Sequence, residues 1–276
     1  AGINGLRVDA GVYPERLQAA IDAGWHTGKE LPGSAGLGHV GAMKLISDGS
    51  LNTRSAYCST PYSGIEPLTY GTLSYTPQQI EDYMRLATEH GFDIACHAIG
   101  DEANTIALNA VAATHAHGSI EHAQMLKPVD IPRFAELGLT ASIQPQHAMD
   151  DRDVITRFWA NPAGIPYPFR ALHDAGTTLR MGSDAPVAPL DPWLAISAAV
   201  LGTESSDREP FQPEQCLDVH TSLAASTATG RDRLASGDPA DVVLLDADPY
   251  AADTPEAMRA MPQHVVMTLL CGERTY

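Results

Sequence analysis

The chain has 276 residues, of which 44% are hydrophobic and 18% are charged, values typical of a globular protein that buries a large core. One barrel-sized domain or two smaller domains fit this length. The formal net charge of −17 and the lack of any uncharged apolar stretch near the roughly 18 residues of a membrane span argue against nucleic acid and membrane partners.

Short apolar strands alternate with amphipathic helices along most of the chain. We expect strands at 6–12, 40–46, 92–97, 120–122, 139–144 and 178–181. We expect helices at 14–23, 77–90, 101–115, 131–137, 168–175, 192–201 and 213–225, several of them followed by glycine. The helix at 77–90 has the clearest start, because Thr76 is a preferred N-cap and Pro77 suits the first helical position. The longest irregular stretches are 28–38 and 145–168.

This order gives six strand–helix units, which predicts a parallel α/β fold. A (β/α) barrel and a doubly wound open sheet both fit the alternation, and the lack of a GxGxxG or GxxxxGK[ST] motif after any strand favours the barrel. After about residue 230, strands at 241–246 and 265–270 follow without helices of barrel type between them. We therefore predict a barrel domain at 1–230 and a small β domain at 231–276.

Lys44 is the most unusual residue of the predicted barrel. It is one of only three lysines among 17 basic residues, and it lies in the apolar run 40–46. A primary amine at the end of a buried strand is costly to desolvate unless it has a partner or a function. Three readings stay open: a lysine that snorkels to solvent, a Schiff-base lysine, and a carbamate that bridges two metal ions.

Further polar residues follow the later strands. His97 and His122 end consecutive strands, and Asp184 comes shortly after the strand at 178–181. The carboxyl ends of barrel strands meet at one face, so we expect these side chains and Lys44 to lie there together. Two imidazoles and a carboxylate, without cysteine, favour one or two divalent ions, zinc in the first place.

Four more residues could support such a site. His147 and Gln144 follow the strand at 139–144 and could contact substrate, although a solvated loop histidine is an equal alternative for His147. Asp101 and Glu121 could accept hydrogen bonds from the ligand histidines and orient them. Both also fit an ordinary place at a helix start or on the surface.

Six short runs carry a resemblance to a known family. They are KLISDGSL at 44–51 followed by Arg54, HAIGD at 97–101, IEHAQ at 120–124, SIQPQH at 142–147, GSDAPV at 182–187 and GDPADVVLLD at 237–246. In this order they resemble the amidohydrolase superfamily, and within it amidohydrolase family 3, the branch of N-substituted formamide deformylase and of proteins called exoenzyme regulators. The resemblance covers nearly the whole chain, and the combination is more specific than any single run.

The resemblance implies a metal-dependent hydrolase on a distorted (β/α)8 barrel, with a small β-sandwich built from both chain termini. It implies that a carbamylated Lys44 bridges two metal ions and that His97 and His122 are ligands. Asp184 would bind metal and act as the general base. The reaction implied is hydrolysis of an amide-type or other non-peptide C–N bond in a small-molecule substrate by metal-activated water.

One family feature is missing from this sequence. The family begins with a His-x-His pair at the end of barrel strand 1, whereas the pair found here, His115-x-His117, ends a helix and follows Lys44. The chain therefore resembles barrel strands 3–8, and we expect that an N-terminal segment of about 200 residues or more is absent. Open sheet edges predict that the chain needs this missing half or a homo-oligomeric partner, and that it has little activity alone.

Two other functions stay open, a non-catalytic regulatory or binding protein that retains the amidohydrolase scaffold and a Schiff-base lyase that uses Lys44. The four cysteines lack CxxC spacing, which predicts reduced thiols and a cytoplasmic location. The first five residues, AGING, lack the features of a signal peptide. Because no initiator Met is present, we expect a truncated or processed product.

Overall fold

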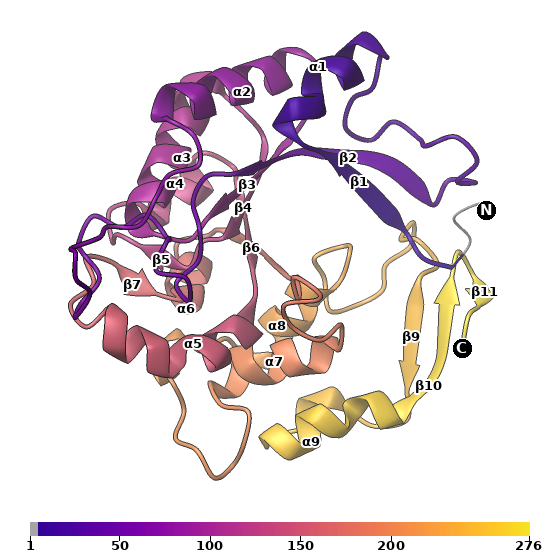
Figure 1. The fold of residues 1–276 in the computed structure, drawn as a ribbon. Coiled ribbons are helices and arrows are strands. Elements are labelled where there is room, and N and C mark those ends of the chain that lie inside the picture. Colours follow the sequence, from indigo (N-terminus) through magenta and orange to yellow (C-terminus); the bar gives the residue numbers. More distant parts are fainter. Residues whose placement is uncertain (1–4) are drawn as a thin grey trace. The chain divides into compact units, whose positions relative to one another are not determined.

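A six-stranded sheet is the main element of the computed structural model, which describes residues 5–276 (Figure 1). In spatial order its strands are β1 (Val8–Val12), β2 (Gly38–Ile46), β3 (Ile94–Ala98), β4 (Gly118–His122), β6 (Thr140–Ile143) and β8 (Thr178–Met181). Neighbouring strands from β1 to β6 pair in parallel. The six predicted strands and the α/β fold class are confirmed. The predicted lack of a signal peptide concerns mainly residues 1–4, which lie outside the described part of the chain.

Helices connect most of these strands. They are α1 (Pro14–Asp22), α2 (Pro77–Glu89), α3 (Asp101–Thr114), α4 (Ile131–Glu136), α5 (Pro145–Phe158) and α6 (Phe169–Asp174). A short antiparallel pair is formed by β5 (Met125–Leu126) and β7 (Ile165–Pro166). Figure 1 shows α1, α2 and α3 along one side of the sheet. Within residues 5–276, no helix combines the length and the apolar character that crossing a bilayer requires.

The two faces of the sheet differ in chemistry, because side chains alternate along each strand. One row of register partners consists of Leu45, Cys96, Ile120 and Ala141, all 0% exposed. The next row, on the opposite face, consists of Ile46, His97, Glu121 and Ser142, none of them fully buried. Lys44 shares this second face, since it lies two residues before Ile46. The apolar face builds the core, and the other face is left for polar chemistry.

The start of α2 follows the predicted local rules. The Thr76 side chain accepts a hydrogen bond from the backbone N–H of Gln79 at 3.2 Å, and the Gln79 side chain accepts one from the N–H of Thr76 at 2.9 Å. This reciprocal capping box satisfies two N–H groups that the helix itself leaves unpaired. The helix then buries Ile80, Met84 and Ala87 at helical spacing.

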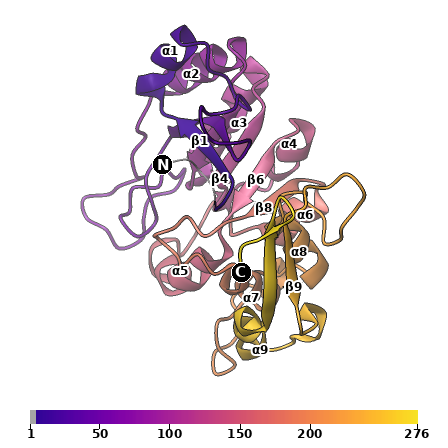
Figure 2. The same ribbon diagram turned by 90° about the vertical axis from the view of Figure 1, so that its right-hand side faces the viewer.

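By internal contacts the chain divides into two units, and the second consists of Ile143–Arg152, Phe169–Ala171 and Leu179–Tyr276. It contains α7 (Pro192–Leu201), α8 (Val219–Ser226), α9 (Pro255–Ala260) and the short 3-10 helices η1 (Pro213–Gln215), η2 (Pro249–Ala251) and η3 (Met261–His264). A separate antiparallel sheet is built from β9 (Val242–Leu245), β10 (Val265–Leu270) and β11 (Glu273–Arg274), as Figure 2 shows in part. The hydrophobic core of the second unit includes Trp193 and Ile196 of α7 together with Met258 and Met261. The separate β layer is confirmed, and the domain boundary at residue 230 stays a prediction.

Two predicted segments are wrong. Residues 145–168 are not irregular throughout, because 145–158 form α5, which begins at Pro145 where proline is favourable in a helix. The predicted helix at 213–225 is interrupted: η1 ends at Gln215, Cys216 is extended, and α8 starts only after Asp218. The Asp218 side chain accepts a hydrogen bond from the N–H of Thr221 at 2.7 Å, which fixes the start of α8 there.

Candidate metal site

His97 and His122 lie together in the first unit. They come from neighbouring strands, β3 and β4, and their rings meet edge to face with centroids 4.5 Å apart. The side chain of His97 is 15% exposed, and His122 is 7% exposed. His122 and the following Ala123 have φ values of 73° and 44°. Residues other than glycine rarely adopt this left-handed conformation, and such strain clusters at functional sites.

Lys44 lies on the same face of the sheet as His97. Its register partner on β3 is Ala95, two residues before His97. Lys44 is partly buried, and among the described residues its side chain has no hydrogen-bond or ion-pair partner. A carboxylate partner therefore does not explain why this lysine is present. The observation is compatible with snorkelling and with a chemical function, and the role of Lys44 stays a prediction.

His147 and Asp184 lie together in the second unit. His147 is in the first turn of α5 and is 9% exposed, whereas Asp184 is exposed and follows β8. A ring nitrogen of His147 and a carboxylate oxygen of Asp184 lie within 4.8 Å of each other. Two atoms that bind one zinc ion at about 2 Å are at most about 4 Å apart, which is close to this upper bound. Asp184 also has a left-handed backbone, with φ of 54°.

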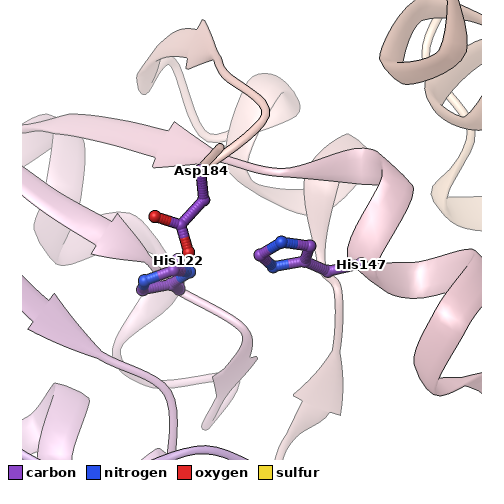
Figure 3. A group of neighbouring side chains, drawn as sticks. All are labelled: His122, His147 and Asp184. Atoms are coloured by element: carbon purple, nitrogen blue, oxygen red, sulfur yellow. The ribbon is translucent and has the colours of Figure 1, made fainter. Parts of the chain in front are cut away.

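Figure 3 draws three ligand candidates, His122 of the first unit and His147 and Asp184 of the second. Each residue offers one ligand atom, and the donor set of two imidazoles and one carboxylate suits zinc and related divalent ions. His122 and Asp184 are predicted ligands. His147 is predicted as a substrate contact, and the structure makes it a ligand candidate as well.

The cysteine next to His97, Cys96, is a poor metal ligand. Cys96 precedes His97 on β3 and is fully buried. Burial, and after it the negative charge of Asp48, raises the pKa of the Cys96 thiol to about 12. Since metals bind the thiolate, a thiol that stays protonated at neutral pH leaves nitrogen and oxygen atoms as the donors.

The remaining predicted site residues have other partners. The carboxylate of Asp101 accepts hydrogen bonds from the backbone N–H of Ser59, at 3.0 Å, and from its hydroxyl, and lies 3.8 Å from the ammonium of Lys127. Glu121 accepts a hydrogen bond from the hydroxyl of Ser119. Gln144 is 6% exposed and directly follows β6. The predicted roles of Asp101, Glu121 and Gln144 stay predictions.

One carboxylate beside a histidine was missed by sequence reasoning. Asp48 Oδ1 lies 3.4 Å from His97 Nε2, and the Asp48 side chain is 0% exposed. Its only signal in the sequence is its place in the run 44–51, where it reads as an ordinary turn residue. Its proximity to His97 depends on the pairing of β2 with β3, which brings residues 49 positions apart into contact.

Histidines and a carboxylate at the ends of parallel strands define a candidate metal-dependent enzyme of the α/β class. The model of the amidohydrolase family matches residues 5–276, so the chain belongs to this family. The predicted resemblance is confirmed.

Individual proteins agree with this assignment. The chain is 31% identical over 229 residues to the putative amidohydrolase YtcJ of Bacillus subtilis, covering 77% of this chain and 43% of YtcJ. It is 25% identical over 240 residues to N-substituted formamide deformylase of Arthrobacter pascens, covering 78% of this chain and 42% of the deformylase. The crystal structure of an uncharacterised metal-dependent hydrolase from Pyrococcus horikoshii matches with a TM-score of 0.71 and 29% identity, covering 81% of this chain and 45% of that one. The matched part of the chain covers less than half of each of these proteins.

Proposed function

We propose that this chain carries metal ligands and the general base of a metal-dependent amidohydrolase that acts on amide-type or other non-peptide C–N bonds. The observations that carry the proposal are the pair of His97 and His122 in the first unit and the pair of His147 and Asp184 in the second, in a chain of the amidohydrolase family. Its donor chemistry fits a divalent ion, and zinc is the ion we expect. A small-molecule substrate is expected, whose identity depends on loops without recognisable motifs.

In this proposal His97, His122, His147 and Asp184 would hold the metal, and Lys44 would contribute as a carbamate. A divalent ion, when bound, supplies Lewis acidity that acidifies water and polarises a carbonyl group. Asp184 accepts a proton from the attacking water and can return it to the leaving nitrogen. Its exposure is compatible with this role, since the carboxylate must exchange protons with solvent.

We further propose that residues 1–230 form an incomplete barrel and that residues 231–276 contribute to a small β-sandwich. Full activity then needs a longer N-terminal part of the protein or a homo-oligomeric partner. The proposal is supported by the matches to YtcJ and to N-substituted formamide deformylase, which cover 43% and 42% of those proteins. A cytoplasmic location is also proposed, because all four cysteines are free thiols.

The proposal is tested by the metal content of the purified chain. We expect bound zinc, measured by elemental analysis after dialysis, and we expect Lys44→Ala to lower the amount bound. Lys29→Ala is the matched control, because Lys29 donates to the carbonyl of Gly24 and stacks over Trp25 away from the site. Wild-type zinc content in Lys44→Ala would contradict the carbamate.

Two further measurements distinguish the hydrolase from the two other candidate functions. Trapping of a carbonyl substrate on Lys44 by borohydride would favour a Schiff-base lyase. Zinc binding without hydrolysis of any amide by the full-length protein would favour a regulatory or binding protein that retains the scaffold.

A further inference from the structure

Two arginines lie against one aromatic ring in the first unit. The guanidinium carbon of Arg54 lies 5.5 Å from the centre of the Phe158 ring, and that of Arg157 lies 4.8 Å from it. Both distances are within the roughly 6 Å at which the face of an aromatic ring attracts a cation. Phe158 is 9% exposed, so its ring is a largely buried support for the two cations. One ring therefore gathers two positive charges from segments that are far apart in the sequence.

Neither arginine is neutralised by a carboxylate within residues 5–276. In this part of the chain the only hydrogen bond of the Arg54 side chain goes from Nη1 to the carbonyl oxygen of Asn52, at 2.9 Å. Arg157 has no hydrogen-bond or ion-pair partner among the described residues. Arg85 on α2, in contrast, forms an ion pair with Glu81. Two unneutralised guanidinium groups at one ring are unexpected in a chain with 34 acidic and 17 basic residues.

The turn that carries Arg54 has a fixed backbone. The N–H of Arg54 donates to the carbonyl oxygen of Leu51 at 2.8 Å, and the N–H of Ser63 donates to the carbonyl oxygen of Phe158 at 2.9 Å. Leu51 is 1% exposed, which anchors the turn in the core. The backbone of Arg54 is left-handed, with φ of 55°, a conformation that residues other than glycine rarely adopt. The Arg54 side chain therefore projects from a well-defined position.

The same turn reaches one histidine of the candidate metal site. The carbonyl oxygen of Gly49 lies 3.3 Å from Nε2 of His97, and the N–H of Gly49 donates to the carbonyl oxygen of Ser55 at 3.2 Å. Arg54 directly precedes Ser55, so it belongs to the segment that contacts His97. A molecule held by Arg54 can therefore extend toward the carboxyl ends of β2 and β3.

Helix and packing effects account for only part of this arrangement. A basic residue in the last turn of a helix stabilises the helix dipole, and Arg157 lies in the last turn of α5. Arg54 lies outside any helix, so this reason does not apply to it. A guanidinium group that stacks on a ring keeps its N–H donors in its own plane, where they can bind both oxygens of a carboxylate. The arrangement therefore favours a ligand with a carboxylate group.

We propose that Arg54 and Arg157 form a binding site for the carboxylate of a small-molecule amide, so that the substrates of this chain are anionic amides. The anion site itself does not rest on the proposed function, whereas its use for a substrate does. Hydrogen bonds between an arginine and a carboxylate are charge-assisted, and such bonds strengthen binding by about 10-fold or more.

The site is tested by titration of the chain with succinamate, a small amide that carries one carboxylate. The side-chain Nε–H signals of the arginines are followed by NMR of 15N-labelled protein, and Arg54→Gln and Arg157→Gln assign the two signals. Succinamide, in which a second amide replaces the carboxylate, is the matched neutral ligand. We expect succinamate to shift both signals and to bind at least about 10-fold more tightly than succinamide. Equal affinity of the two ligands, or no shift at either arginine, would overturn the proposal.

Variants distinguish binding from a structural role. We expect Arg54→Gln and Arg157→Gln each to weaken succinamate binding by about 10-fold. Arg54→Lys keeps the charge but lacks the paired donors, so it should recover only part of the affinity. Arg85→Gln is the control, because it removes only the ion pair with Glu81, and it should bind as the wild type does. An equal loss of affinity in Arg85→Gln and Arg54→Gln would overturn the proposal.

The anion site and the proposed function can fail separately. If succinamate binds through both arginines and the full-length protein hydrolyses no amide, the proposed function fails and the anion site is supported. If the full-length protein hydrolyses neutral amides with a higher kcat/KM than their anionic counterparts, the proposed function is supported and the assignment of anionic substrates is overturned.

Discussion

The imidazole rings of His97 and His122 meet edge to face, with an interplanar angle of 69°. The contact follows from the parallel register of β3 and β4, which pairs Ala98 with His122 and so sets His97 beside the end of β4. The left-handed backbone of His122 then departs from the strand conformation that its neighbours follow. Two ligand candidates are therefore brought together by sheet geometry and not by a long flexible loop.

Replacement of His122 by alanine should remove zinc binding. A direct ligand matters more than an outer partner, so we expect the dissociation constant to rise by more than about 100-fold. The measurement is zinc titration against a competing chelator. His117→Ala is the control, because His117 is exposed and precedes β4. Wild-type affinity in His122→Ala would contradict a metal centre at the end of β4.

Replacement of His147 by alanine separates two roles for this residue. If His147 is a metal ligand beside Asp184, His147→Ala should lower the zinc affinity, as we expect for His122→Ala. As a substrate contact, its loss should leave the zinc affinity unchanged and raise KM in the full-length enzyme. The ligand role is the expected one, because the ligand atoms of His147 and Asp184 lie within 4.8 Å. Affinity is measured by titration, with His173→Ala, at the exposed end of α6, as the control.

Several elements could be predicted because their signals are local. The strand at 178–181 and the helix at 192–201 match the structure residue for residue. The start of α2 can be predicted from Thr76, Pro77 and Gln79, which lie within one turn of each other. His97, His122 and Asp184 could be chosen as site residues because parallel strands place their carboxyl ends at one edge.

Other features depend on contacts that the sequence does not display. The segment 145–158 carries a proline and four charged residues in a row, which are typical of a loop, yet Asp151 is 5% exposed within α5. Asp48 looks like a turn residue until β2 and β3 pair. His147 becomes a ligand candidate only when α5 is recognised as a helix that begins at Pro145. In each case tertiary structure decides what the local pattern leaves ambiguous.

Gly100 should tolerate no side chain. A Cβ atom built there would lie 2.0 Å from the carbonyl oxygen of Tyr57, although the backbone of Gly100 has an ordinary φ of −69°. Because the obstacle is backbone and not a flexible side chain, we expect Gly100→Ala to lower the free energy of unfolding by more than about 3 kcal/mol. Urea denaturation measures this change. Gly5→Ala, with nothing within 4 Å of the added atom, should change it by less than about 0.5 kcal/mol.

The capping box of α2 should contribute measurably to stability. Thr76→Ala removes the acceptor of the Gln79 N–H, and we expect it to lower the free energy of unfolding by about 1 kcal/mol. Gln78→Ala is the control on the exposed side of the same helix, where only a bond to Asp82 is lost and the change should stay within about 0.5 kcal/mol. Equal effects of the two variants would argue that the cap does not stabilise the helix.

Cys96 should make the fold less stable at alkaline pH. Its pKa is raised from 9.0 to about 12, first by burial and then by Asp48, so the unfolded chain loses this proton at a lower pH than the folded chain. The contribution of the buried thiol is therefore complete below pH 9 and is lost as the pH rises toward 12, by about 1.4 kcal/mol per pH unit. Cys96→Ala removes the group, and its free energy of unfolding should fall less steeply than that of the wild type over this range. Urea denaturation at a series of pH values measures both slopes, and parallel slopes would mean that Cys96 ionises equally in the folded and unfolded chains.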